Sequence, residues 1–334
     1  MTTNFDVAIR PVLVSIKFVG IINISFTMQE QTRLLIWDPN TKFYTLLELT
    51  RILILFILTH LYLTSSFQTI LGRFYLITFW KIVIEGRISE MSIVKFINGI
   101  VEFDKKVIPL LSHLSVKQRS ISIIYWNIFY FLLIMYLIAY KLLCLYLFPP
   151  STPDINLVAI LFIGPPFIVH FVVFILTFYF LYNLYIRFKT LNDLWKCLPV
   201  GLIAAPDQWT HSEVMILIDD IRLLHSELSE LLKIFSEGCG PMLVTFFLSN
   251  YINTLINFYF TYNFGHFQPE YNLTHNLLRI IIIYIAVGQS IVGVMIIIML
   301  ASFINDKRRM IIHYARLNRI SKLPVDIKRQ VIYI

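Results

Sequence analysis

Long apolar stretches, each about as long as a bilayer-crossing helix, dominate the pattern of this chain. The hydrocarbon core is about 30 Å thick and a helix rises about 1.5 Å per residue, so a crossing needs about 20 mainly apolar residues. Five stretches meet this requirement easily: 44–66, 121–148, 157–186, 241–262 and 277–304. A sixth, 70–97, is interrupted by charged side chains: Arg73, Lys81, Glu85, Arg87 and Glu90. The pattern predicts an all-α, polytopic bundle of transmembrane helices.

The distribution of Lys and Arg indicates which segments face the cytoplasm, because short cytoplasmic loops collect these residues and translocated loops lack them. Of the segments outside the predicted spans, four contain basic residues: 1–43, 99–121, 186–240 and 305–334. Three segments contain none: 64–72, 149–156 and 263–275. An even number of crossings must separate two cytoplasmic segments, so 70–97 is also predicted to cross, with its charges facing other helices. This gives six predicted spans, with both ends of the chain in the cytoplasm.

The apolar run from Pro11 to Phe26 is short and contains Lys17 and Asn23. We interpret it as a re-entrant or interfacial segment of the cytoplasmic N-terminus, 1–43. The alternative is that this run spans together with 44–66, while 70–97 lies on the membrane surface.

The expected organisation has five parts: the N-terminus 1–43, spans one to four in 44–186, a cytoplasmic loop at 187–240, spans five and six in 241–304, and a basic cytoplasmic tail at 305–334. Asn272 begins an Asn-Leu-Thr sequon in a segment that the charge pattern places outside, so we expect it to be glycosylated.

One predicted water-facing segment, a helix over 211–237, has a regular pattern. Apolar residues recur at heptad a and d positions for three repeats: Val214, Leu217, Ile221, Leu224, Leu228, Leu231 and Phe235. Two interpretations are open. The helix packs on its own subunit, or the seam is an anchor at which subunits meet. The run Gly238-Cys239-Gly240-Pro241 is expected to end this helix before the fifth span.

Polar side chains inside predicted spans are costly and therefore draw attention. Lys81 and Glu85 lie four residues apart and are expected to neutralise each other on one helix face. Asn250, Asn253 and Asn257 share another face, which is as suited to helix packing as to lining a polar cavity.

A small-molecule site should be concave and mostly apolar or aromatic, with a few polar groups. The outer halves of the spans supply eight candidate ligand-binding residues: Trp80, Tyr136, Tyr140, His170, Tyr259, Tyr262, Tyr284 and Gln289. Tyr136 and Tyr140 lie four residues apart, so they are predicted to form one stacking wall. Core packing is the alternative for Trp80, and an interfacial aromatic belt for Tyr262. Our preferred three are Tyr140, Tyr259 and Gln289.

Composition excludes several classes of protein. Of 334 residues, 57% are apolar and only 14% are charged, which is too few to cover a water-facing surface. Soluble enzymes, disordered chains and disulfide scaffolds are therefore excluded. The net charge of +8 has little soluble face on which to bind nucleic acid, so no nucleic-acid partner is expected. The sequence has no CxxC pair and no catalytic motif, and we expect no metal, no cofactor and no enzymatic activity.

The order of these features resembles the layout of a known family. A Pro11…Lys17…Gly20 run precedes the spans, the inner loop opens with Arg187-Phe188-Lys189-Thr190-Leu191-Asn192, and a cytoplasmic helix (Ile218 to Phe235) leads into the fifth span. The sixth span ends in Asn305-Asp306-Lys307-Arg308-Arg309. This layout resembles the insect gustatory receptors, seven-span chemoreceptors related to the insect odorant receptors.

The resemblance implies a plasma-membrane receptor for small-molecule tastants, with a cytoplasmic N-terminus. Members form homo- or hetero-tetrameric, ligand-gated cation channels, with a ligand pocket in the outer half of each bundle and a cytoplasmic anchor between subunits. The family's most specific motif, a Thr-Tyr-x5-Gln-Phe-like run in the seventh span, is not found in this sequence, so the seventh span is expected to be missing from it. A G-protein-coupled type of receptor and a multi-span transporter are the alternatives.

Overall fold

The computed structural model describes residues 5–29, 31–37, 42–65, 70–113, 123–147, 165–204, 211–267 and 273–316. These ranges contain α1 (Phe5–Val19), β1 (Phe26–Met28), β2 (Leu35–Trp37), α2 (Lys42–Ser65), α3 (Ile70–Ile88), α4 (Glu90–His113), α5 (Ile123–Leu147), α7 (Pro165–Ala204), α8 (His211–Phe267) and α9 (Leu273–Arg316). The two short strands pair as an antiparallel hairpin. The predicted all-α helical bundle is confirmed.

Five of the described helices are long and apolar enough to cross a membrane, and each overlaps one of the predicted spans. Their apolar windows are Phe43–His60, Ile123–Cys144, Ile168–Lys196, Ile216–Tyr259 and Leu277–Met310. The chain is therefore a helical membrane protein. The stretch 70–97 is not one helix, because α3 ends at Ile88 and α4 begins at Glu90. Its crossing of the membrane stays a prediction.

Two charged side chains of α3 pair with each other. Lys81 Nζ lies 3.8 Å from Glu85 Oε1, which confirms the predicted pair on one helix face. Glu85 also accepts a hydrogen bond of 3.0 Å from the Thr245 hydroxyl of α8. The Glu85 carboxylate thus links α3 to α8.

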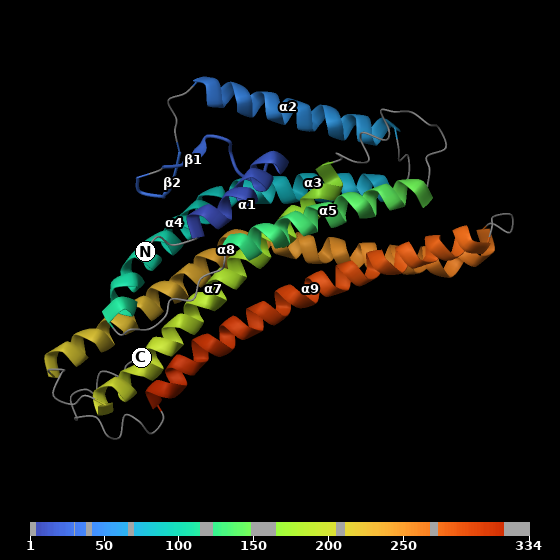
Figure 1. Cartoon of the computed structure of the whole chain (residues 1–334). Helices are drawn as coiled ribbons and strands as arrows, with labels where there is room; N and C mark the ends of the chain where they lie inside the picture. The colour runs from blue at the N-terminus through green and yellow to red at the C-terminus, as the bar shows by residue number, and fades with distance from the viewer. Residues whose placement is uncertain are drawn as a thin grey trace.

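Helices α7, α8 and α9 are much longer than a bilayer is thick, and they run along the length of the molecule (Figure 1). They contain 40, 57 and 44 residues. At about 1.5 Å per residue they measure about 60, 85 and 66 Å, against about 30 Å of hydrocarbon. Each is therefore longer than a membrane crossing requires, and α8 also packs against α4.

Helix α8 continues through the run from Gly238 to Pro241, so the predicted helix end there is wrong. Proline removes only one backbone donor, and the buried side chains of Cys239 and Met242 keep this turn packed. Gly238 allows α4 to come close, because a Cβ at this position would lie 2.6 Å from the Ser92 Cβ. The glycine is required by helix packing and does not terminate α8.

The N-terminal helix α1 packs within the bundle. Its inward face is almost fully buried: Ala8, Ile9, Val12 and Ile16. Tyr179 of α7 donates a hydrogen bond of 3.1 Å to the Phe5 carbonyl, and Trp126 Nε1 of α5 donates one of 2.9 Å to the Ala8 carbonyl. The run that we interpreted as re-entrant or interfacial therefore begins as a helix packed against α5 and α7.

The chain reverses direction directly after α1. Gly20 has a φ of 95°, a conformation that residues with a Cβ adopt only with strain. Arg51 of α2 donates a hydrogen bond of 3.0 Å to the Ile22 carbonyl, and Glu48 accepts one of 3.2 Å from the Ile24 amide. Charged side chains of α2 thus hydrogen-bond to backbone groups of this turn.

The heptad residues of α8 are buried against other helices of the same chain. The described members of the seam are Leu217, Ile221, Leu224, Leu228, Leu231 and Phe235, and the side chain of Val214 lies outside the described residues. The Phe235 ring lies 5.4 Å from that of Phe96 in α4 and 6.0 Å from that of Phe180 in α7. This arrangement agrees with packing within one subunit, and the six described seam residues leave no exposed stripe for a second subunit.

A buried ion pair joins α4 to α7 near this packed region. The Asp104 and Arg187 side chains are only 7% and 9% exposed. Arg187 donates from Nε to Asp104 Oδ1 at 2.9 Å and from Nη2 to Oδ2 at 2.5 Å, so the pair is bidentate. A third nitrogen donates to the carbonyl and the side-chain oxygen of Asn183, each at 3.0 Å. The guanidinium is thus compensated in charge and in hydrogen bonding.

Candidate functional site

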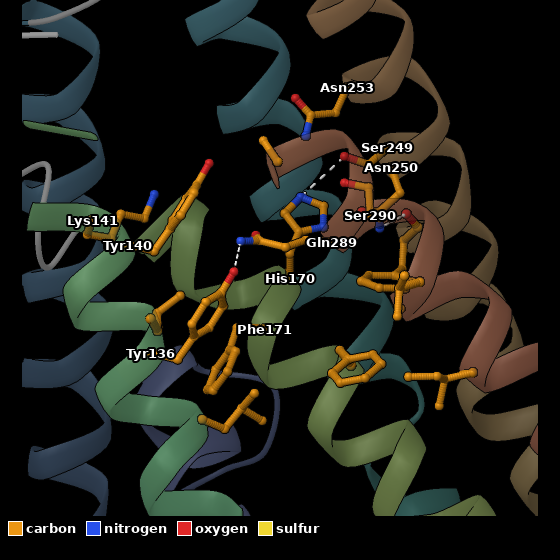
Figure 2. A pocket seen from close by; sticks show the side chains of 18 of the residues that line it. Tyr136, Tyr140, Lys141, His170, Phe171, Ser249, Asn250, Asn253, Gln289 and Ser290 are labelled. Atoms are coloured by element: carbon orange, nitrogen blue, oxygen red, sulfur yellow. Dashed lines mark hydrogen bonds between the residues drawn. The ribbon is translucent and has the colours of Figure 1, made fainter. Parts of the chain in front are cut away.

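Four helices, α5, α7, α8 and α9, enclose a cavity of about 510 Å³ (Figure 2). This volume lies within the usual range for small-molecule sites, about 300–1,000 Å³. The polar lining consists of Tyr136, Tyr140, Lys141, His170, Ser249, Asn250, Asn253, Asn257, Gln289 and Ser290. The apolar lining consists of four aromatic rings (Phe129, Phe171, Phe174 and Phe246) and of Leu133, Leu137, Ala286, Val292, Gly293 and Ile296. The mixture is that of a binding site, with apolar walls and a limited number of polar groups.

Four of the eight predicted ligand-binding residues line this cavity. Tyr136 and Tyr140 come from α5, His170 from α7 and Gln289 from α9. Three helices far apart in the sequence thus bring these side chains together, as Figure 2 shows. Two of our preferred three, Tyr140 and Gln289, are among them.

The other four predicted residues do not line it within the described structure. Trp80 packs edge-on against Phe79, with ring centroids 5.2 Å apart, on α3. Tyr259 and Tyr284 are 65% and 54% exposed on the outer faces of α8 and α9. The side chain of Tyr262 lies outside the described residues, as does Asn272, the predicted glycosylation site.

The two tyrosines of α5 form one wall of the cavity. Their rings stack with centroids 6.3 Å apart and an interplanar angle of 26°, as the four-residue spacing predicts. The Tyr136 hydroxyl also accepts a hydrogen bond from Gln289 Nε2 of α9. This contact fixes the Gln289 carboxamide against the tyrosine wall.

The imidazole of His170 forms the opposite polar surface, with Ser249 of α8. The Ser249 Oγ lies 3.2 Å from His170 Nε2. The His170 ring packs against that of Phe246, with centroids 5.8 Å apart. His170 Nδ1 is buried and has no hydrogen-bond partner among the described residues. A ligand in the cavity can supply that partner.

The asparagine face of α8 lies in the cavity. Asn250, Asn253 and Asn257 all line it, so of the two roles left open for them the structure favours the lining of a polar cavity. Asn250 Nδ2 donates a hydrogen bond of 2.8 Å to the Phe246 carbonyl, which directs the amide group along its own helix.

Sequence reasoning missed Lys141 and Ser249 as site residues. Lys141 could have been identified from the sequence, because a charged side chain within an apolar span is a functional candidate in its own right. Ser249 could not, because serine is common in membrane helices and hydrogen-bonds readily within them.

The site is suited to binding, since its polar groups hydrogen-bond to one another across helices. Within the ranges given above, no group of three or more His, Cys, Asp or Glu side chains is placed to hold a metal ion.

No model of a known protein family matches the chain, and a search of the curated proteins finds no match either. The cavity and the composition of its walls therefore form the basis for a functional proposal.

Proposed function

We propose that this protein is a membrane chemoreceptor that binds a small-molecule tastant in the cavity between α5, α7, α8 and α9. The cavity itself carries the proposal, with about 510 Å³ of space lined by aromatic rings, an imidazole and carboxamides. Such groups can stack on a ligand and also fix its orientation through hydrogen bonds. The layout of the sequence, which resembles that of the insect gustatory receptors, supports the same proposal.

By the same resemblance, we propose that the chain is a subunit of a tetrameric, ligand-gated cation channel in the plasma membrane. The continuity of α8 supports this, because one helix carries Asn250 of the cavity and Leu228 of the distant packed region. Subunit contacts would lie outside the heptad seam, whose side chains are already buried. A multi-span transporter is the alternative, since it too would use a cavity between spans.

Alanine substitutions at Tyr136 and Gln289 are expected to raise the tastant concentration for half-maximal response about tenfold, because each removes a polar contact worth roughly 1.5 kcal/mol. The measurement is cation flux in cells that express the receptor with related subunits, challenged with a panel of tastants. Tyr125→Ala and Tyr284→Ala are matched controls, because these residues lie on the same two helices but are exposed outside the cavity. Unchanged sensitivity of both cavity variants, at equal surface expression, would contradict the proposal.

The predicted membrane orientation has its own test. An epitope tag before Met1 is expected to be inaccessible on intact cells, and Asn272 is expected to carry a glycan that Asn272→Gln removes. The physical reason is the absence of basic residues from 263–275 and their abundance in 186–240. A tag at the N-terminus that is labelled without permeabilising the cells would show the opposite orientation.

A further inference from the structure

The cavity is not sealed, and it reaches the outer surface of the bundle between α5 and α9. Three residues that line it are also exposed: Phe129 and Tyr136 of α5, and Val292 of α9. Tyr136 is 47% exposed and Val292 is 57% exposed, so both contribute to the wall of the cavity and to the outside of the molecule. These residues therefore form the rim of an opening between the two helices.

The opening lies within the membrane-crossing parts of α5 and α9. Phe129 and Tyr136 belong to the apolar window Ile123–Cys144, and Val292 belongs to Leu277–Met310. Exposed side chains near the rim are apolar as well: Leu132 and Met135 on α5, and Ile291 and Met295 on α9. The core of a bilayer contains no water. The opening thus faces the hydrocarbon chains of the lipid.

One hydrogen bond joins the two helices beside the opening. Gln289 Nε2 of α9 donates to the Tyr136 hydroxyl of α5 (Figure 2). Of the four helices around the cavity, α5 has the smallest buried share of its apolar window. A helix with few buried apolar contacts separates from its neighbours at a low cost in free energy. The gap between α5 and α9 can therefore widen to admit a ligand.

Several polar groups of the lining are already hydrogen-bonded within the protein. Asn250 Nδ2 donates to the Phe246 carbonyl at 2.8 Å, and Asn257 Nδ2 donates to Asn253 Oδ1 at 3.4 Å. A ligand with many polar atoms gains little from such groups, because each new hydrogen bond replaces an existing one. Such a ligand would also lose its hydrogen bonds to water on crossing the hydrocarbon. The lining and the position of the opening both favour a mainly apolar ligand.

We infer that the cavity takes a small lipophilic aromatic molecule, which enters sideways from the bilayer between α5 and α9. The inference rests on the proposed function and specifies the ligand of the same site. The ligand passes the rim at Tyr136 and Val292, and its ring packs against the aromatic lining, which includes Phe171. A lipophilic molecule concentrates in the bilayer, so its local concentration at this opening is higher than in water.

The test is photolabelling of the whole protein in phosphatidylcholine nanodiscs. The probe is (trifluoromethyl)phenyldiazirine, a small aromatic reagent that partitions into lipid and forms a reactive carbene on illumination. Peptide mass spectrometry is expected to find the label on Phe171 or Phe174, inside the cavity. This labelling should saturate and should be competed by excess (trifluoromethyl)benzene. Labelling of Phe56, which is exposed on α2, should not saturate.

A bulky side chain at the rim distinguishes entry through this opening from other routes. Val292→Trp is expected to lose the labelling inside the cavity, because the indole fills the gap between α5 and α9. Ile298→Trp is the matched control, because Ile298 is similarly exposed on the same helix but lies outside the cavity. Labelling of Phe56 should be equal in all variants, since it reports only the amount of reagent in the lipid.

Three outcomes would overturn the inference. Labelling confined to outward-facing residues such as Phe56 would show that the cavity is closed to the bilayer. That result would leave the proposed receptor intact, because a ligand that enters from water would still be detected with the tastant panel. Labelling inside the cavity that persists in Val292→Trp would show that the probe enters elsewhere. A co-purified phospholipid that blocks the labelling until it is removed would assign the cavity to an acyl chain.

Discussion

Replacing Asp104 with alanine is expected to lower the free energy of unfolding by about 3–5 kcal/mol, because removal of one partner leaves the other charge buried and uncompensated. Both side chains of the Asp104–Arg187 pair are less than a tenth exposed, and the pair joins α4 to α7. The measurement is thermal or denaturant-induced unfolding of the purified protein in detergent. Glu237→Ala is the matched control, since its pairing with Lys233 is exposed and worth less than about 1 kcal/mol.

A double substitution separates the charge from the packing. Asp104→Leu combined with Arg187→Met removes both charges and keeps apolar volume, so it is expected to recover a large part of the lost stability. An Asp104→Ala variant as stable as the unmodified protein would mean that the buried pair does not form.

Replacing Leu224 and Leu228 together with glutamate is expected to prevent folding, with loss of monodisperse protein in detergent. Each buried leucine contributes about 1.5–3 kcal/mol, and the introduced carboxylates would be buried without partners. Both residues are buried, and their helix α8 packs against α4 and α7 of the same chain. Leu223→Glu is the matched control, because Leu223 is 61% exposed on the same turn of α8.

Size-exclusion chromatography distinguishes the two interpretations of the seam. A double variant that stays folded and merely changes from a larger assembly to a monomer would show that the seam joins subunits. A double variant that aggregates, while Leu223→Glu behaves like the unmodified protein, supports packing within one chain.

Five of the spanning helices could be predicted from the sequence, because about 20 consecutive apolar residues have few stable alternatives to a membrane crossing. The helices against which the heptad seam packs could not be predicted from the sequence. A stripe of leucines packs equally well against a helix of the same chain or of another subunit, and Phe96 and Phe180, which cover Phe235, lie far away in the sequence. The same limit applies to α1, whose position depends on hydrogen bonds from Trp126 and Tyr179.

Only half of the predicted ligand-binding residues line the cavity, for a related reason. Spacing along a helix gives the angle between two side chains, but not the direction in which either of them points. Tyr284 and Gln289 are five residues apart and thus about 140° apart around α9, so they do not share a face. Tyr259 likewise lies about 200° from Asn257 on α8. Which face meets the cavity depends on the rotation of each helix, which distant contacts determine.

Because α8 is continuous through Gly238, the whole helix can tilt as one rigid body. A close approach of α8 to α4, at Gly238 and Ser92, lies between the cavity and the seam. From that point, Asn250 is about 18 Å away in one direction and Leu224 about 21 Å in the other, at about 1.5 Å per residue. A rigid rod that pivots there moves its two ends by nearly equal distances in opposite directions. A tilt of about 5° displaces Asn250 by about 1.6 Å and Leu224 by about 1.8 Å, roughly a third of the radius of the helix with its side chains.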